Sequence, residues 1–481
     1  MQKLTRLAAR RPLAVAAVVL AAGAITLTAP ASPALAASSA TIDGAVRYQQ
    51  IAGFGSSEAF GQASIIEDAP AAAQQQVLNL LYSPTTGAGL TILRNEVGAD
   101  PGSTIEPTAP ASPSAPPSYV SLQSINNDMG QLWLAQTIKA DYGVRDIFAD
   151  AWTAPAYMKT NDSTSNGGTL CGVSGATCTS GDWRQAYANF LVQYARDYAQ
   201  AGVPLSYLGF ENEANLAPGY DGMVMDPAQT ADFADVLGPT LARSGLPTRL
   251  ECCATEGWDY AQQYAAAIEA DPVASHFVRL FTSHGYTEAP ASPLAGWYKP
   301  AWETEWSTFQ SWDPAWDDGT TASGLSWAQN IYTGLTQANL SAFLYWWGTS
   351  TPTFNGDNES LVQVNGSTVT ASARLWAFAN YSRFIHPGAV RIGATTTDGN
   401  LELTAFRNFD GSTAIVVLNT GTSPDTVSFA LRHLGIRNGT LATPYLTDSS
   451  DDTAAQPPVP VFGGNLTATL PARSLVTFDI R

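Results

Sequence analysis

Two short acidic clusters, far apart in the sequence, contain residue types that can cleave a glycosidic bond. The first reads GFENEAN and contains Glu211 and Glu213; the second reads WETEWS and contains Glu303 and Glu305. Glycosidic hydrolysis needs one carboxyl group that protonates the leaving oxygen and a second that attacks the sugar or stabilises its cation. Surface salt bridges are the alternative, but lysine and arginine are scarce and both clusters lie in aromatic, apolar sequence. The pattern therefore favours a catalytic pair.

Alternating short β-rich runs and helical patterns between residues 51 and 386 would position these clusters. The predicted strands are 51–56, 90–97, 145–152, 205–212, 248–254, 279–286, 300–307 and 342–348. The predicted helices include 70–82, 129–141, 183–201, 227–243, 259–269 and 325–339, with a closing helix over 371–385. Eight such repeats, without a glycine fingerprint after the first strand, favour an α/β fold of the (β/α)8 TIM-barrel type over an open doubly wound sheet. The acidic clusters then end the fourth and seventh strands, on the face where barrel enzymes carry their active sites.

The sequence changes character after Pro387-Gly388. Short alternating runs separated by Gly, Asn and Asp predict an attached antiparallel β-sandwich side domain over residues 387–481. Residues 37–50 are also strand-like and are expected to supply an N-terminal strand to this side domain, which leaves 51–386 as the catalytic barrel. A carbohydrate-binding module is the alternative, but no flexible linker separates the two parts, so we expect a packed side domain.

Residues 1–36 have the pattern of a signal peptide. A basic start precedes an apolar stretch over 13–27 and a small-residue cleavage site, Ala34-Leu35-Ala36. A membrane anchor is less favoured because Pro30 and Pro33 end the apolar run before it reaches a comfortable spanning length. We expect export by the general or the twin-arginine route, and a secreted, extracellular protein.

Composition excludes several other classes of protein. The 481 residues include 23 Lys and Arg against 41 Asp and Glu, a formal net charge of −18 that argues against nucleic-acid binding. The four His and four Cys lack metal-ligand spacing, and no GxSxG elbow or P-loop is present. We therefore expect no metal or organic cofactor, no membrane association after signal removal, and a monomer.

The cysteines suit an oxidising compartment. Cys171 and Cys178 bracket a short Gly/Ser loop and could form a disulfide. Cys252 and Cys253 are adjacent, which permits either a vicinal bridge or two buried thiols.

Several long motifs resemble glycoside hydrolase family 30. They include IAGFGSSEAF, ADAWTAPAYMKTN, GFENEAN, WETEWS and RLWAFANYSRFIHPGAVRI, while NGGTLCGVSGATCTSGDWRQAYANF, LECCATEGW and ANLSAFLYWWG are similar to its fungal-type (subfamily 7) xylanase branch. The resemblance implies a barrel with a β side domain and hydrolysis with retention, in which Glu213 is the acid/base and Glu305 the nucleophile. It further implies endo-β-1,4-xylanase-like action on plant cell-wall xylan or glucuronoxylan. Ala214 stands where the family usually has proline, which alters the stiffness of the loop but not the proton donor.

Such a double displacement sets requirements on the pair. Glu213 must be protonated, and we expect the negative charge of Glu305 to raise the pKa of Glu213 while hydrogen bonds keep Glu305 ionised. The two carboxylates should face each other at about 5–5.5 Å. The resemblance implies that Asn212 donates to the sugar 2-hydroxyl. Glu211 and Glu303, two residues before the pair, are expected to orient their neighbours from the same strand face.

Further residues are predicted to bind substrate or to position the pair. Arg94 follows an apolar run on the second strand and could bind Glu305, although a structural ion pair explains it equally well. His284 and Tyr286 share a face at the end of the sixth strand. Aromatic side chains that offer stacking faces for sugars are Trp152, Tyr157, Tyr220, Trp258, Trp306, Trp346 and Trp347.

One position departs from the family pattern in a way that concerns specificity. Members that bind glucuronate usually carry an arginine where this sequence has Gln62, and a neutral amide lacks the charge-assisted contact to a carboxylate. Strict dependence on glucuronate is therefore not expected. The alternatives are an endo-β-1,6-galactanase or β-1,6-glucanase of the same family, or a sugar-binding barrel that has lost catalysis.

Overall fold

The structure is a computed structural model that describes residues 38–353 and 358–481. The signal peptide predicted at residues 1–36 lies outside the described residues.

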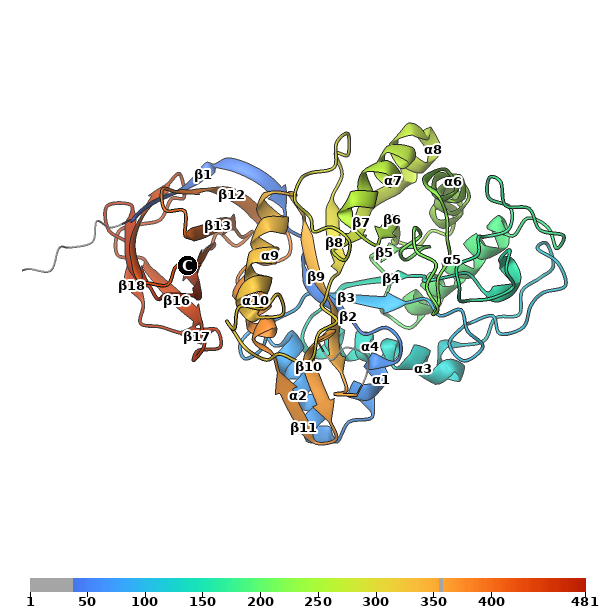
Figure 1. The fold of residues 1–481 in the computed structure, drawn as a ribbon, viewed down its shortest axis with the longest axis horizontal. Coiled ribbons are helices and arrows are strands. Elements are labelled where there is room, and N and C mark those ends of the chain that lie inside the picture. Colours follow the sequence, from blue (N-terminus) through green and yellow to red (C-terminus); the bar gives the residue numbers. More distant parts are fainter. Residues whose placement is uncertain (1–37, 354–357) are drawn as a thin grey trace, which may run out of the picture. The chain divides into compact units, whose positions relative to one another are not determined.

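Eight parallel strands form a closed barrel (Figure 1). Neighbouring strands pair in chain order, and the last strand, β9, pairs with both β8 and the first barrel strand, β2. The (β/α)8 prediction is therefore confirmed. The barrel strands are β2 (Gly53–Ser57), β3 (Ile92–Glu96), β4 (Asp146–Asp150), β5 (Tyr207–Leu208), β6 (Arg249–Thr255), β7 (Val278–His284), β8 (Ala301–Glu305) and β9 (Ala342–Ser350).

Helices follow the strands around the outside of the barrel, close to the predicted ranges (Figure 1). Local sequence explains where the helices begin. For example, α6 begins after Asp226, whose carboxylate accepts hydrogen bonds from two backbone N–H groups of the first turn. A proline occupies the first helical position, where its missing N–H has no cost. The helices are α1 (Gln62–Glu67), α2 (Ala71–Tyr82), α3 (Asn126–Met129), α4 (Gln131–Asp141), α5 (Arg184–Gln200), α6 (Pro227–Arg243), α7 (Trp258–Ala270), α8 (Pro272–Phe277), α9 (Gly324–Thr336) and α10 (Ala373–Ser382).

Strand β5 is much shorter than the predicted 205–212. It ends at Leu208, and the next residue, Gly209, passes between two buried acidic side chains of the neighbouring strands. A Cβ at this glycine would lie 2.3 Å from Asp150 Oδ1 and 1.8 Å from Glu251 Oε1. Only glycine therefore fits here; its N–H still donates to the Ala149 carbonyl of β4 at 2.8 Å, and the segment beyond it that contains Glu211 and Glu213 is irregular rather than strand.

A short hairpin that the sequence reading missed extends the barrel sheet. Strand β10 (Ser360–Asn365) pairs in parallel with β9, and β11 (Thr368–Ala371) pairs antiparallel with β10. Figure 1 shows this hairpin beside α2.

A second sheet of ten strands forms the side domain. Its long first strand, β1 (Ser38–Gln50), pairs antiparallel with β12 and in parallel with β15, so one pairing departs from the antiparallel pattern. A separate apolar cluster, with Ile42, Ile415 and Phe478 at its centre, fills the interior. The remaining strands are β12 (Val390–Thr396), β13 (Leu401–Arg407), β14 (Thr413–Asn419), β15 (Asp425–Arg432), β16 (Leu441–Thr447), β17 (Ala454–Ala455), β18 (Val459–Pro460), β19 (Asn465–Leu470) and β20 (Ser474–Ile480).

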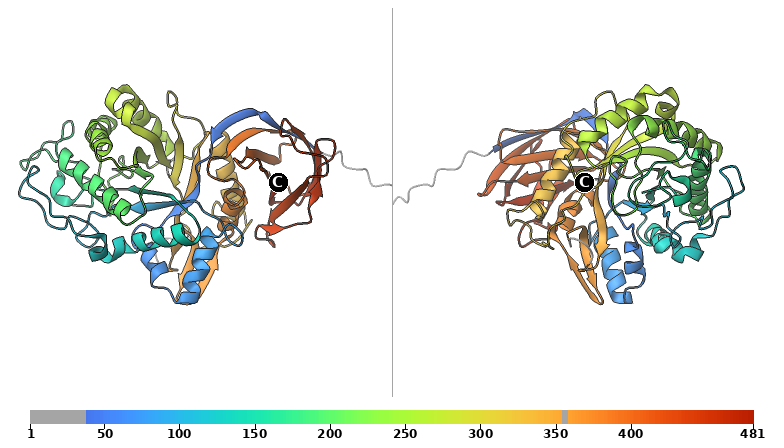
Figure 2. Two further views of the ribbon diagram at one scale, coloured as in Figure 1. Left: turned by 180° about the vertical axis from the view of Figure 1, so that it is seen from behind. Right: turned by 45° about the vertical axis from the view of Figure 1, so that its right-hand side comes forward.

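Helices α9 and α10 lie between the barrel and the second sheet (Figure 2). A bidentate ion pair, with 2.6 and 2.7 Å between guanidinium nitrogens and carboxylate oxygens, joins Arg473 of the sheet domain to Asp317 of the barrel, and the indole of Trp316 donates to the Arg473 carbonyl at 2.6 Å. We keep 37–50, 51–386 and 387–481 as proposed domain limits.

Both cysteine pairs are disulfides in the structure. Cys171–Cys178 closes the short loop, and Cys252–Cys253 is a vicinal bridge at the middle of β6. Within the described ranges, no helix has both the length and the apolar character needed to cross a membrane.

Candidate active site

The two predicted catalytic glutamates share one pocket at the carboxyl ends of the barrel strands. The pocket has a volume of about 370 Å³, and both Glu213 and Glu305 line it. An oxygen of Glu213 and an oxygen of Glu305 lie within 4.8 Å of each other. Both side chains are buried, each residue being only 5% exposed, so a reacting bond between them would be largely shielded from water.

Glu213 has an unusual backbone conformation. It lies five residues beyond the end of β5 with φ = 50°, in the left-handed region that residues with a Cβ rarely adopt. Its N–H donates to the Ala254 carbonyl at 2.7 Å, and its own carbonyl accepts from the Leu216 N–H at 2.7 Å. These bonds hold the side chain toward the pocket, as is common for strained residues at functional sites.

Glu305 is the last residue of β8 and is surrounded by hydrogen-bond donors. The Arg94 guanidinium donates to its Oε2, and the Tyr286 hydroxyl donates to its Oε1 at 2.9 Å. A carboxylate that accepts a charge-assisted bond and a hydroxyl bond is stabilised as the anion. This is the form that a nucleophile must take.

Glu213 is suited to carry a proton. Burial raises its pKa to about 7, against smaller lowering contributions from the hydrogen bond that Tyr220 donates to Oε2 and from the charge of Arg94. The physical cause therefore differs from the predicted one. Burial, rather than the charge of Glu305, raises this pKa, because the adjacent Arg94 guanidinium offsets the charge of Glu305.

His284, at the end of β7, lies between the two glutamates. Its Nδ1 is 3.1 Å from Glu213 Oε1 and its Nε2 is 3.7 Å from Glu305 Oε2. Burial lowers the pKa of His284 to about 3, so the ring is neutral at ordinary pH. A neutral imidazole adds no cation between the two acids, and its hydrogen bond at Nδ1 positions Glu213.

Arg94, on β3, connects several site residues and is fully buried. Besides Glu305, it donates to Asp150 Oδ2 at 3.1 Å and to Asn212 Oδ1 at 2.5 Å. Because Arg94 occupies the oxygen of Asn212, the amide nitrogen of Asn212 is the group left to donate to a sugar hydroxyl. Its guanidinium also lies 4.4 Å from the ring centroid of Trp152.

The predicted aromatic residues divide into two groups. Trp152, Tyr220, Tyr286, Trp346 and Trp347 line the pocket. The other three do not line it: Tyr157 packs edge-on against Trp183, Trp258 donates to Glu303 Oε2 at 2.7 Å, and Trp306 packs against Trp327. Tyr157, predicted to bind substrate, therefore does not line this pocket.

The acidic neighbours of the pair are buried away from the pocket. Glu303 accepts the bond from Trp258, and Glu211 accepts from the Thr230 hydroxyl at 3.0 Å. Burial raises the pKa of both well above its ordinary value. The expectation of a shared strand face is wrong for Glu211 and Glu213, because both lie beyond the end of β5.

Sequence reasoning missed other residues that line the pocket. Phe60 has φ = 55° in the loop after β2, and Phe309, which is 67% exposed, stacks on Tyr286 at 5.5 Å between ring centroids. Both are aromatic residues in loops that follow barrel strands, a position that could have identified them. The other missed lining residues are Leu216, Glu256 and Glu359.

Gln62 does not reach the pocket. It is the first residue of α1, is 1% exposed, and donates to the Phe60 carbonyl at 3.3 Å. It therefore supports the loop that carries Phe60 and is turned away from the substrate side.

Two side-chain groups among the described residues have ligand atoms close enough to hold a metal ion. One is Glu213, His284 and Glu305, where the Arg94 guanidinium already neutralises a carboxylate. The other is Glu211, Cys252 and Cys253, whose sulfurs form a disulfide and cannot act as thiolate ligands. Neither donor set suits a resident cation.

Profiles of two protein domains match the chain. The glycosyl hydrolase family 30 TIM-barrel domain matches residues 51–296, and the glycosyl hydrolase family 30 beta sandwich domain matches residues 388–478. Together they account for most of the barrel and nearly all of the second sheet.

Solved structures and characterised proteins give a finer comparison. The catalytic domain of the GH30 xylanase C from Talaromyces cellulolyticus is 43% identical, with a TM-score of 0.86 and coverage of 92% of this chain and 100% of that chain. A glucuronoxylanase of Bacillus subtilis is 24% identical over 341 residues, covering 69% of this chain and 74% of the relative. An endo-1,6-β-D-glucanase of Trichoderma harzianum is 23% identical over 402 residues, covering 77% and 78%.

Proposed function

The chain belongs to glycosyl hydrolase family 30, and from this premise we propose that it is an exported, retaining glycosidase that cleaves β-1,4-xylan. Glu213 is the proposed acid/base and Glu305 the proposed nucleophile. The family's general activity is glycoside hydrolysis; what we propose beyond it is the β-1,4-xylan linkage, retention of configuration and the roles of these two residues.

The observation that carries this proposal is the separation of the two carboxylates. Their facing oxygens lie within 4.8 Å. Retaining glycosidases hold the two groups at about 5–5.5 Å, whereas inverting enzymes need about 6.5–9.5 Å to fit a water molecule behind the sugar. The short separation therefore favours direct attack by a carboxylate.

The surroundings of each group match its step. In the first step, ionised Glu305 attacks the anomeric carbon while Glu213 transfers its proton to the departing oxygen. In the second, Glu213, now a carboxylate, takes a proton from water, and the resulting hydroxide displaces Glu305 and releases the sugar. The donors around Glu305 suit the anion of the first step, and a pKa of about 7 lets Glu213 serve as both acid and base.

The choice of xylan rests on the similarity to the Talaromyces cellulolyticus xylanase, which is closer in sequence than the β-1,6-glucanase of Trichoderma harzianum. The aromatic lining of the pocket agrees with stacking on sugar rings in general.

Acidic side chains near the pocket favour an uncharged stretch of xylan over a glucuronate branch. A neighbouring cavity of about 700 Å³ shares Phe60 and Tyr220 with the pocket and is lined by Glu96, Asp100 and Asp221. The carboxylates of Asp100 and Asp221 would repel a glucuronate group. With Gln62 turned away as well, we propose that glucuronate branches are not required.

Export is supported by the basic and apolar pattern of residues 1–36 and by the two disulfides, since such bonds persist in oxidising compartments.

The test is product analysis on purified linear xylan, glucuronoxylan and β-1,6-glucan, with NMR of the first-formed anomer. We expect xylan cleavage with retained β configuration, and loss of at least 1,000-fold in kcat for Glu305→Gln. The exposed Glu288, in the loop after β7, supplies a matched control, and Glu288→Gln should keep full activity. An inverted product, or a Glu305→Gln variant of normal rate, would refute the mechanism. Preference for β-1,6-glucan would refute the proposed linkage.

A further inference from the structure

A second cavity lies at the opposite end of the barrel from the predicted active site. It has a volume of about 620 Å³ and is lined by residues at the amino ends of the barrel strands, including Tyr207 of β5, Arg249 of β6 and Trp302 of β8. The end of β1 and the loop over 285–300 complete its walls. The catalytic chemistry derived above makes no use of this cavity.

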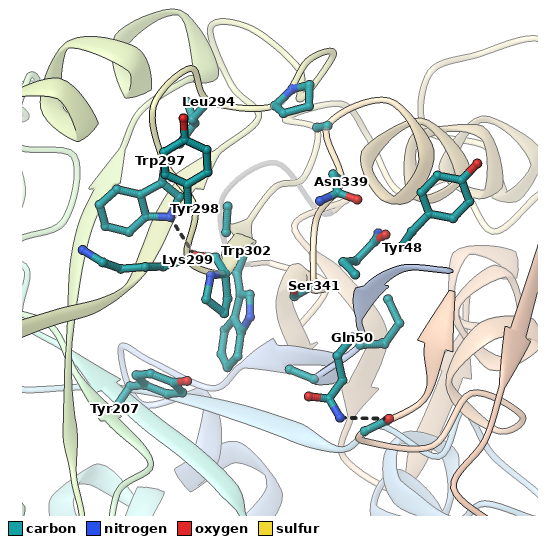
Figure 3. Close-up of a pocket in the computed structure, with 18 of the residues that line it drawn as sticks. Tyr48, Gln50, Tyr207, Leu294, Trp297, Tyr298, Lys299, Trp302, Asn339 and Ser341 are labelled. Atoms are coloured by element: carbon teal, nitrogen blue, oxygen red, sulfur yellow. Dashed lines mark hydrogen bonds between the residues drawn. The ribbon is translucent and has the colours of Figure 1, made fainter. Parts of the chain in front are cut away.

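The lining combines aromatic faces with neutral hydrogen-bonding groups. Figure 3 shows Tyr207, Trp297, Tyr298 and Trp302 on one side of the cavity and Asn339 and Ser341 on the other, with Gln50, whose amide donates to the Gly388 carbonyl at 3.1 Å, below them. Tyr298 is 95% exposed, so its ring is accessible to a ligand. A pyranose ring has an apolar C–H face and a rim of hydroxyl groups, so this arrangement suits a sugar better than a purely apolar ligand.

The charged side chains of the cavity are already engaged within the protein. Lys299 forms an ion pair with Glu269 at 2.6 Å, and the Arg249 guanidinium lies 4.2 Å from the ring centroid of Tyr207. Asp146 accepts a bond from the Ser206 hydroxyl at 3.0 Å. Apart from the Arg249 guanidinium, the groups left to meet a ligand are neutral, which favours an uncharged sugar.

An unpartnered donor points to a missing ligand group. Trp302 is 2% exposed, and among the described residues nothing accepts a hydrogen bond from its indole nitrogen. The nearby indole of Trp297 donates to the Pro300 carbonyl at 3.1 Å, drawn as a dashed line in Figure 3. Buried donors are normally satisfied, so the N–H of Trp302, one of the residues that line the cavity, lacks an acceptor that a sugar hydroxyl could supply.

We propose that this cavity is a second binding site for an uncharged segment of the polysaccharide that the enzyme cleaves. The inference rests on the proposed function, because xylan is the ligand it names. A segment held at the amino-terminal face of the barrel would keep the enzyme on an insoluble polymer while the opposite face cleaves other stretches of chain, an avidity effect that needs no change at the catalytic site.

The test separates binding from turnover. In a Glu305→Gln background, we would measure depletion of the protein onto insoluble linear β-1,4-xylan, for the parent and for a double variant, Tyr48→Ala with Tyr298→Ala. Tyr48, near the end of β1, also lines the cavity. We expect the double variant to bind at least fivefold more weakly. The matched control is Phe409→Ala, which removes a 99% exposed aromatic residue in the turn between β13 and β14 and should leave binding unchanged. With Glu305 intact, the double variant should cleave a short soluble xylo-oligosaccharide at the parental rate.

A second readout reports on the cavity itself. Xylohexaose should shift the indole N–H resonance of Trp302, assigned with a Trp302→Phe variant. Unchanged xylan binding by the double variant, or a Trp302 signal insensitive to xylohexaose, would overturn the second site even if xylan is cleaved. Tyr298-dependent binding without cleavage would instead refute the proposed function and keep the site. A dimer in sedimentation velocity that Tyr298→Ala dissociates would show that a second copy covers the cavity, and would also overturn the proposal.

Discussion

Nδ1 of His284 lies 3.1 Å from Oε1 of Glu213, which links the proton of the predicted acid to the tautomer of a buried, neutral ring. When Glu213 is protonated it can donate to Nδ1, and the ring then carries its own proton on Nε2. That nitrogen is 3.7 Å from Glu305 Oε2. With Glu213 protonated, the ring is therefore the tautomer that carries its proton on Nε2. Glu213 then faces the acceptor nitrogen of the ring, and Glu305 faces the nitrogen that carries the proton.

Loss of the His284 imidazole should slow the reaction but should not change the number of inflections in the pH–rate profile. A hydrogen bond between neutral groups contributes about 0.5–1.5 kcal/mol, so His284→Phe should lower kcat by about 2- to 10-fold. His284→Gln, which can still hydrogen-bond, should recover part of the rate. Because the pKa of His284 is about 3, neither variant should remove an inflection near pH 6.5. Steady-state kinetics from pH 4 to 9 would check this, with the half-exposed His386→Gln as control. An inflection near pH 6.5 that disappears in His284→Gln would contradict a neutral ring.

The alkaline limb of the activity profile should report the proton of Glu213. Its pKa is about 7, and kcat/KM should fall as pH rises through this value because the leaving oxygen loses its acid. The Tyr220 hydroxyl donates to Glu213 Oε2 at 3.2 Å and lowers that pKa, so Tyr220→Phe should move the limb to higher pH. Tyr157→Phe, outside the pocket, is the matched control and should leave the profile in place. A limb that moves to lower pH in Tyr220→Phe would contradict this assignment.

Arg94 should not be replaceable by lysine. One ammonium group cannot reproduce the planar contacts to Glu305, Asp150 and Asn212, and would leave buried acids without partners. We expect Arg94→Lys to lower kcat/KM by at least about 100-fold, and the free energy of unfolding by about 3 kcal/mol, as when one partner of a buried pair is lost.

Urea unfolding and kinetics on the same preparation would measure both effects of Arg94→Lys. Arg184 is a suitable control because it pairs with Asp182 and Asp232 in a partly exposed setting, where Arg184→Lys should cost at most about 1 kcal/mol. Equal, small losses in both variants would show that Arg94 is an ordinary structural cation.

The barrel was predictable from sequence because its signals are local and repeated. Strand and helix periods recur eight times, and the acidic motifs fall where strands end. The need for glycine at position 209, just beyond β5, was not predictable, since it depends on Asp150 and Glu251 meeting beside Gly209, three residues from three different strands or loops. The cause of the raised pKa of Glu213 was not predictable for the same reason. The burial of Glu213 and its proximity to Arg94 arise only when the pocket is assembled. Sequence could predict that Glu213 and Glu305 share a pocket, but not what surrounds them there.

Glu96 gives a prediction about stability. It is 4% exposed on β3, its Oε2 accepts a bond from the Phe60 N–H at 2.8 Å, and burial raises its pKa from 4.5 to about 8. Between these values the folded protein holds a proton that the unfolded chain releases. The contribution of Glu96 to stability is therefore fully present below about pH 4.5 and is lost as pH rises toward 8, by up to about 1.4 kcal/mol per pH unit.

Glu96→Gln keeps the acceptor for Phe60 but cannot titrate. We therefore expect the unfolding free energy of the parent, relative to this variant, to decrease steadily from pH 5 to pH 8, as measured by urea denaturation at several pH values. The exposed Glu288→Gln variant should run parallel to the parent over the same range. Parallel curves for parent and Glu96→Gln would mean that Glu96 is ionised in the folded protein. The cavity that it lines with Asp100 and Asp221 would then carry a further negative charge at neutral pH, which would strengthen its exclusion of glucuronate.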